Sequence, residues 1–197
     1  MVANGFTIRP LVSDDLETHI KRLTQIYLDA FTIGSYSHNA GKENEPIAIE
    51  YLHKMIRVGG EALLAFDDGE LAYPDYPIGF LFATPLTFDY LMLETSIPTK
   101  FNVERCRYIA ELAVDRGHRR RGIARGLITT YVSSQDTSKT DAVLVRTNES
   151  NPNLLKLYDN AGFQKLDDTP LQHGYVKKRY FCAHLVDPNQ DSGVNAG

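Results

Sequence analysis

Five arginines and one histidine lie within ten residues, from Arg116 to Arg125, and no acidic residue interrupts them. Such a run can bind nucleic acid, act as a sorting signal or hold one particular phosphate group. The rest of the chain contains the other 16 Lys and Arg residues and all 25 acidic residues, so it carries a formal charge of −9. Because binding to a polyanion depends on neutralising many phosphates, this acidic remainder favours a small anion bound locally.

The basic run lies between a predicted strand that ends at Val114 and a predicted helix. The apolar residues of that helix recur at helical spacing: Ile123, Ala124, Leu127, Ile128, Tyr131 and Val132. We expect the helix to begin near Arg120 or Arg121, where free amides and the helix dipole would form an anion site. Small residues, Gly122 and Ala124, would let a ligand approach the backbone.

Two interpretations of these arginines remain open at this point. They could simply solvate the end of a helix. However, a positive charge at a helix N-terminus opposes the dipole, so clustering arginines there has an energetic cost that a phosphate ligand would offset. The spacing matches neither a Walker A loop nor a complete dinucleotide-binding loop.

A second segment, TNESNPNLLKLYDNAGF, has the start and stop signals of a short helix. Asn151 suits the N-cap, a proline follows it, and Gly162 suits the C-terminal stop. Asn151 and Tyr158 share one helix face with Leu154 or Leu155, so both polar side chains are expected to face one groove. Taken alone, an asparagine that only caps and a tyrosine that only packs are the more common case.

The segment ELAVDRGHRRRGIARGLI resembles the acyl-CoA binding motif of the GNAT superfamily of N-acetyltransferases. In that motif an apolar strand ends in valine, an Arg or Gln follows five residues later, and two small residues open a helix. Val114, Arg119, Gly122 and Ala124 take these places here. The second segment resembles the family's Asn, helix, Tyr and Gly-Phe motif, and both motifs occur in the family's order within residues 107–163.

The resemblance implies acetyl-CoA as a co-substrate and no metal. The pyrophosphate would rest on the backbone of one loop: Arg119, Arg120, Arg121, Gly122, Ile123 and Ala124. The pantetheine would pair with the strand backbone of Leu112, Ala113 and Val114, like an added strand. Family members place an asparagine like Asn151 on the pantetheine arm, and here Leu155 shares its helix face. They place a tyrosine like Tyr158 beside the CoA sulfur.

The resemblance also implies the catalytic roles. Tyr158 would protonate the leaving thiolate, and the backbone N–H of Val114 would stabilise the developing oxyanion. Glu111 would deprotonate the amine directly or through a water, and the alternative for Glu111 is a strand acid that faces solvent. No Cys–His or Ser–His–Asp grouping suggests a covalent intermediate, so we expect direct attack in a ternary complex.

Other polar residues carry weaker expectations. Asp89, Tyr90 and His173 lie in segments that could line the amine pocket. We expect the remaining loop histidines, His38 and His118, to be exposed to solvent. Cys106 and Cys182 make no metal pattern, so we expect them to be ordinary packing residues.

These patterns predict one mixed α/β domain over residues 1–186, followed by a disordered tail over residues 187–197. The resemblance implies the GNAT-like acyl-CoA N-acyltransferase fold. Its central, mostly antiparallel sheet would be flanked by helices and would splay between the strands at 107–114 and 141–148, with CoA in the gap. Strands are also expected at 6–9, 62–66, 77–86 and 179–186, and helices at 16–30 and 46–58.

We therefore predict acetyl transfer from acetyl-CoA to a primary amine of a small molecule or a protein. Two alternatives stay open: a catalytically silent acyl-CoA-binding sensor, and a nucleic-acid-binding protein that uses the arginine run. The absence of a secretory signal, a membrane span or a disulfide framework predicts a cytoplasmic protein. Members of the family are often homodimers, so a homodimer is a further expectation.

Overall fold

A computed structural model of the chain describes residues 5–12, 15–31, 44–69, 75–86, 101–166, 171–173 and 176–185. The chain divides into two compact units, residues 1–84 with 109–131 and residues 85–108 with 132–197. Strands and helices occur in both units, which confirms the predicted α/β class. The single domain over residues 1–186 stays a prediction, and the predicted tail lies outside the described residues.

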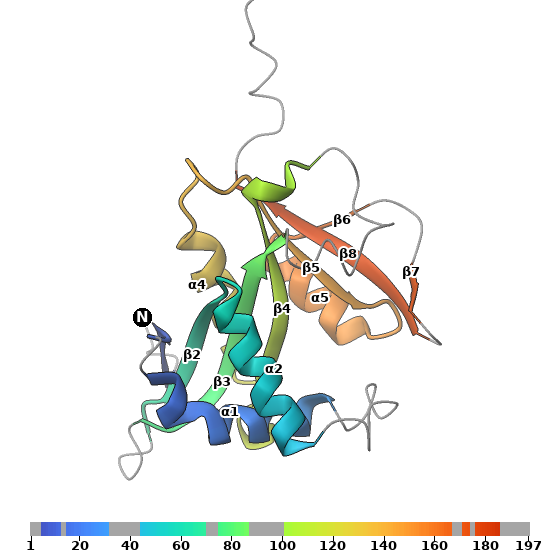
Figure 1. Cartoon of the computed structure of the whole chain (residues 1–197). Coiled ribbons are helices and arrows are strands. Elements are labelled where there is room, and N and C mark those ends of the chain that lie inside the picture. The colour runs from blue at the N-terminus through green and yellow to red at the C-terminus, as the bar shows by residue number, and fades with distance from the viewer. Residues whose placement is uncertain are drawn as a thin grey trace, which may run out of the picture. The chain divides into compact units, whose positions relative to one another are not determined.

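The first unit contains a sheet with the strand order β1-β2-β3-β4, formed by β1 (Phe6–Pro10), β2 (Glu61–Asp67), β3 (Pro77–Pro85) and β4 (Cys106–Val114). β2 pairs antiparallel with both β1 and β3. Helices cover both faces of this sheet (Figure 1), which explains why β2 and β3 are buried at nearly every position rather than at every second one. The strands predicted from the sequence are confirmed.

Helices α1 (Leu16–Phe31) and α2 (Glu45–Arg57) cover one face of this sheet (Figure 1). Their shared core contains Leu23, Ile26, Leu52, Met55, Leu64, Phe80 and Phe82, all at most 1% exposed. The side chain of Asn44 caps α2 by accepting a hydrogen bond from the Ile47 amide (3.2 Å). Both helices confirm the sequence prediction.

Helix α4 (Ile123–Ser133) covers the other face. A Cβ placed on Gly126 would lie 3.0 Å from the Phe6 ring, so α4 packs closely on β1 at this glycine. A Cβ on Gly79 of β3 would lie 3.1 Å from the carbonyl oxygen of Ala113 and 3.3 Å from Ile123. The missing side chain at Gly79 therefore lets the first residue of α4 pack beside the end of β4.

The second unit is built on β8 (Val176–His184), which pairs antiparallel with β5 (Ala142–Asn148), β6 (Gln164–Lys165) and β7 (Leu171–His173). Helix α5 (Pro152–Asn160) packs on this sheet, because the Tyr158 ring lies 6.1 Å from the Phe181 ring of β8. The predictions for β5, α5 and β8 are confirmed. The sequence pattern missed β6 and β7, which are too short to show an alternation of apolar residues.

Cys106 and Cys182 are buried and not bonded to each other, as expected for packing residues. Burial raises the pKa of the Cys106 thiol to about 11, so this thiol stays protonated at neutral pH. No helix of the described ranges has the length and apolar character needed to cross a membrane. The same ranges hold no group of three or more His, Cys, Asp or Glu residues placed to bind a metal ion.

Candidate active site

The loop between β4 and α4 begins with a short turn that Asp115 caps. The Asp115 carboxylate accepts a hydrogen bond from the amide of Gly117 (2.9 Å) and so closes the 3-10 turn η4 (Arg116–His118). Asp115 itself is fixed to the sheet, because its amide donates to the carbonyl of Ile78 on β3 (2.8 Å). The start of the loop therefore has a defined position relative to β3 and β4.

The helix after this loop begins at Ile123, so the predicted start near Arg120 or Arg121 is wrong. Arg120 (φ 65°) and Gly122 (φ 85°) are both left-handed, and such residues cannot belong to a right-handed helix. The sequence pattern could not show this, because apolar spacing locates a helix face but not the backbone angles of the residues before it.

Several backbone amides at this helix start have no acceptor inside the helix. The first helical hydrogen bond runs from the amide of Gly126 to the carbonyl of Gly122 (2.9 Å). The amides of Ile123, Ala124 and Arg125 therefore have no acceptor within α4. A Cβ placed on Gly122 would meet no atom within 4 Å, so the space at this glycine is open. Loop and helix start thus have the features of an anion site.

Two arginines of the basic run hold this loop in place through hydrogen bonds and an ion pair. Arg119 donates from Nε to the carbonyl of Val114 (3.0 Å), back to the end of β4. Arg121 binds both oxygens of Asp67 (2.5 and 3.2 Å) and donates to the carbonyl of Gly5 (3.0 Å). The cost of placing arginines at a helix N-terminus is therefore partly offset within the protein, by Asp67.

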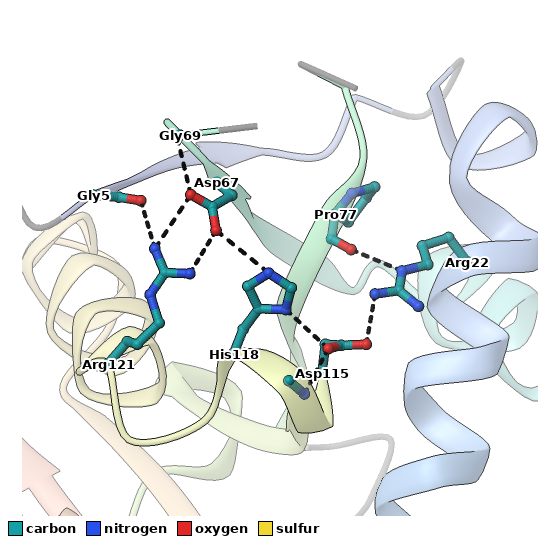
Figure 2. A network of polar contacts seen from close by, with 9 residues as sticks. Gly5, Arg22, Asp67, Gly69, Pro77, Asp115, His118 and Arg121 are labelled. Atoms are coloured by element: carbon teal, nitrogen blue, oxygen red, sulfur yellow. Dashed lines mark hydrogen bonds and ion pairs between the residues drawn. The ribbon is translucent and has the colours of Figure 1, made fainter. Parts of the chain in front are cut away.

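A chain of polar contacts connects Arg121 with helix α1 (Figure 2). Asp67 lies 3.3 Å from Nε2 of His118, and Nδ1 of the same ring lies 2.9 Å from Asp115. Asp115 in turn accepts a hydrogen bond of 2.6 Å from Arg22, whose Nε donates to the carbonyl of Pro77 (3.0 Å). We call Arg22, Asp67, Asp115, His118 and Arg121 the loop network.

The network lowers the pKa of both carboxyl groups. The hydrogen bond from Arg121 is the main cause that brings the pKa of Asp67 to about 2. Burial alone would raise the pKa of Asp115, but hydrogen bonds from His118, Arg22 and the Gly117 amide outweigh it and lower that pKa. Both groups are therefore ionised at neutral pH.

The expectation that His118 is exposed to solvent is wrong. Its side chain is only 20% exposed and both ring nitrogens face carboxylates. The reason is tertiary: one carboxylate belongs to Asp115, three residues away, but the other belongs to Asp67 at the end of β2. A loop histidine next to arginines in the sequence gives no sign of either partner.

Glu111, the expected base, lies on β4 and is partly buried rather than facing solvent. Its Oε1 accepts a hydrogen bond of 2.7 Å from the hydroxyl of Tyr51 on α2. The Tyr51 ring lies 5.7 Å from the Tyr27 ring, which lies 4.8 Å from Phe31. Glu111 is therefore the acidic residue beside a group of aromatic side chains from α1 and α2.

The strand positions predicted to bind the pantetheine, Leu112, Ala113 and Val114, are the last three residues of β4 before the loop. Ala113 is buried, and Leu112 and Val114 are partly exposed. These positions directly precede the loop whose amides are open, so one continuous backbone segment joins them to the anion site.

In the second unit, Asn151 caps α5 as predicted, with its Oδ1 accepting hydrogen bonds from the amides of Asn153 (3.2 Å) and Leu154 (3.3 Å). These contacts use the oxygen of the Asn151 side chain and not its NH₂ group. Tyr158 is 4% exposed and packs against Phe163 and Phe181, while Leu155 on the same helix is partly exposed. The predicted roles of Asn151, Leu155 and Tyr158 toward CoA stay predictions.

His38, Asp89 and Tyr90 lie outside the described residues. His173 ends strand β7 instead of lying in a loop.

The sequence analysis missed Tyr51, Asp67 and Arg22. Asp67 lies in a segment that reads only as a turn, and Tyr51 and Arg22 lie on helices among ordinary core and surface residues. Asp115 carried a weak signal, because an aspartate two residues before a glycine commonly forms such a side-chain-capped turn.

The model of the acetyltransferase (GNAT) family matches residues 20–163 of this chain. The chain belongs to this family. The GNAT match runs from within α1 to just past the end of α5, and it includes the loop network, the open amides of α4 and Glu111.

Solved GNAT structures share the fold. A Salmonella typhimurium acetyltransferase, yncA, solved with acetyl-CoA, superimposes with a TM-score of 0.67 at 14% identity, over 98% of this chain and 99% of that chain. Arabidopsis thaliana NAA60, solved with acetyl-CoA, has a TM-score of 0.64 at 19% identity, over 91% of this chain and 98% of that chain. These likenesses confirm the GNAT-like fold that the sequence motifs implied.

A closer match in sequence is restricted to a short segment. N-alpha-acetyltransferase 30 from Xenopus laevis is 41% identical over 56 residues, which is 28% of this chain and 20% of that protein. The human protein of the same name matches equally well over 16% of its length. The chain thus aligns with only a small part of these curated relatives.

Proposed function

We propose that this GNAT protein transfers the acetyl group of acetyl-CoA to the α-amine at the N-terminus of a protein or peptide. The observation that carries the acetyl-CoA assignment is the set of open amides at the start of α4, after the loop that follows β4. The choice of acceptor rests on the 41% identity to N-alpha-acetyltransferase 30 over 56 residues. A small-molecule amine is the alternative acceptor.

The residues of the loop fit the diphosphate of acetyl-CoA. It would be held by the amides of Ile123, Ala124 and Arg125 and by the backbone of Arg119 to Gly122. A diphosphate needs convergent donors, positive potential and room, and the left-handed residues, the helix dipole and the open space at Gly122 offer these. Arg116, Arg120 and Arg125 are exposed and add positive charge around the site.

Glu111 is the proposed base. An N-terminal ammonium, with a pKa of about 8, must lose a proton before its nitrogen can attack the thioester carbonyl. The Glu111 carboxylate accepts this proton, directly or through a water. The hydrogen bond from Tyr51 helps to hold the carboxylate in one orientation.

The rest of the reaction follows from the family resemblance. The amine nitrogen forms a bond to the carbonyl carbon, and the backbone N–H of Val114 stabilises the negative charge that develops on the oxygen. The carbon–sulfur bond then breaks, and the phenol of Tyr158 protonates the departing CoA thiolate. No residue of the protein is acetylated on the way, so both substrates must be bound together.

The first experiment is thermal unfolding with and without acetyl-CoA. A ligand at about a hundred times its Kd stabilises the folded state by about 2.7 kcal/mol, so a clear rise in Tm is expected. Gly122→Glu, which places a bulky acid in the open space, should abolish the rise. The matched control is Gly162→Glu, because Gly162 also has a positive φ of 83° and open space around it but lies after α5.

The acceptor is tested by release of CoA thiol with peptides. Peptides with a free α-amine and no lysine should be acetylated, and mass spectrometry should place the acetyl group on the first residue. The same peptides with a blocked N-terminus and one internal lysine should remain unmodified. Acetylation of the lysine alone, or of small amines but no peptide, would overturn the choice of acceptor and leave the acetyltransferase activity in place.

A further inference from the structure

Arg121 is the last arginine before the open amides of Ile123, Ala124 and Arg125, but its guanidinium is already engaged elsewhere. It pairs with both oxygens of Asp67 and donates to the carbonyl of Gly5. The register of β1 and β2 places Phe6 opposite Asp67, which explains why one guanidinium reaches both strands. A guanidinium bound in this two-pronged way has lost the geometry needed to grip a phosphate in the same fashion.

Asp67 is itself held firmly. Its side chain is only 10% exposed, and its Oδ1 accepts a further hydrogen bond from the amide of Gly69 (3.0 Å) in the turn after β2. Its Oδ2 faces His118 at 3.3 Å, as Figure 2 shows. Asp67 therefore joins the end of the loop, at Arg121, to the middle of the loop, at His118.

The backbone between these anchors is strained. Arg120 has a φ of 65°, a left-handed conformation that is unfavourable for a residue with a side chain. Such a residue keeps this conformation only where its surroundings fix it. Its neighbours supply that constraint, because Arg119 is tied to the carbonyl of Val114 and Arg121 is tied to Asp67.

We propose that Asp67 is a positioning residue for the acetyl-CoA site, which acts through Arg121 and His118 to hold the loop backbone open toward the diphosphate. The side chain of Arg121 then fixes the position of the loop and does not bind the phosphate. The backbone amides bind the diphosphate. This inference rests on the proposed function, since it takes the diphosphate of acetyl-CoA as the ligand of the loop.

The proposal predicts that Asp67→Asn changes the affinity for acetyl-CoA in the direction opposite to that expected from charge alone. Asp67→Asn removes a negative charge near the site and releases a guanidinium, so a charge-only view expects acetyl-CoA to bind more tightly. If Asp67 positions the loop, the same change raises the Kd and the KM for acetyl-CoA, by about tenfold, and leaves kcat within about twofold. A tenfold change in Kd equals about 1.4 kcal/mol.

The matched control is Asp68→Asn, one residue further along the same turn. The side chain of Asp68 accepts a hydrogen bond from Thr7 (2.6 Å). The amide of Asp68 donates to the carbonyl of Gly5 (3.2 Å), a backbone contact that the substitution leaves in place. Its substitution removes the same charge from the same turn. The KM for acetyl-CoA should therefore stay within about twofold of the wild-type value.

Kd is measured by calorimetry with acetyl-CoA, and KM and kcat are measured with saturating peptide. An Asp67→Asn protein that folds and binds acetyl-CoA as well as the wild type, or more tightly, would overturn the proposal. A wild-type protein that does not bind acetyl-CoA would overturn the proposed function itself, and the inference with it, so the two failures are distinguishable.

A second variant decides the matter if Asp67→Asn does not fold. Arg121→Lys keeps the positive charge, but an ammonium cannot form the two-pronged pair with Asp67 while also binding the carbonyl of Gly5. The proposal expects the KM for acetyl-CoA to rise in this variant by about as much as in Arg121→Gln. A lysine variant with a wild-type KM would show that only the charge of Arg121 matters.

Discussion

The hydroxyl of Tyr51 on α2 donates a hydrogen bond of 2.7 Å to the carboxylate of Glu111 on β4. This contact joins the helix layer of the first unit to the strand that leads into the acetyl-CoA loop. It also turns one oxygen of Glu111 toward α2 and so fixes the plane of the carboxylate. The orientation of the proposed base therefore depends on a residue 60 positions away in the sequence.

Tyr51→Phe should slow catalysis without weakening the binding of acetyl-CoA. A hydrogen bond to a charged group contributes about 1.5–3 kcal/mol, so we expect kcat/KM for the peptide to fall by about tenfold or more. The thermal shift with acetyl-CoA should be unchanged, because the phenylalanine keeps the packing against Tyr27. A fall in acetyl-CoA affinity with normal peptide kinetics would show that Tyr51 acts on the loop instead.

Glu111→Gln should lower kcat by about 10²–10⁴-fold at neutral pH, the usual contribution of a general base. The variant should regain rate as the pH rises above about 8, because the α-amine then loses its proton without help. Steady-state rates between pH 6 and pH 9.5 measure this difference. If the rate of the variant stays at the same fraction of the wild-type rate over this range, Glu111 does not act as the base.

The loop network should make folding sensitive to acid. The hydrogen bond from Arg121 lowers the pKa of Asp67 from its usual 3.8 to about 2. Because the pKa is lower in the folded state, this stabilisation is fully present above about pH 4 and is lost as the pH falls through about 2. Urea unfolding from pH 5 to pH 2 should show a smaller loss of stability in Asp67→Asn, and Asp68→Asn should retain the wild-type slope.

His19 should add a second acid-sensitive step at higher pH. Burial against Phe66, whose ring lies 5.8 Å away, lowers the pKa of His19 from 6.5, although Asp15 partly opposes the shift. The unfolded chain therefore binds a proton first, so stability is highest above about pH 6.5 and falls as the pH drops through the folded-state pKa. His19→Phe should flatten this slope between pH 7 and pH 5.

His53→Gln is the control for that experiment. His53 lies on α2 with a side chain 23% exposed, 3.6 Å from Glu17, whereas His19 is almost fully buried. The control should unfold with the same dependence on pH as the wild type. A slope that survives in His19→Phe would assign this acid sensitivity to another group.

Much of the fold could be predicted because its signals are local. The apolar spacing in α1, α2 and α5, the cap at Asn151 and the long buried strands are set by residues that are close neighbours in the chain. The start of α4 could not be placed from apolar spacing, because it depends on left-handed residues at Arg120 and Gly122. One of them is an arginine, which rarely adopts that conformation without external support.

The sequence by itself indicated the family, which the family match confirms, since two motifs with fixed spacing carry it. The same motifs point to the loop proposed to bind acetyl-CoA and to the residues proposed for catalysis. Only the tertiary structure decided which arginines are left for a phosphate and how Glu111 is held. Arg121 meets Asp67 across 54 positions of the chain, and Tyr51 meets Glu111 across 60. Such contacts follow from strand register and from helix packing on the sheet, which no local pattern of residues encodes.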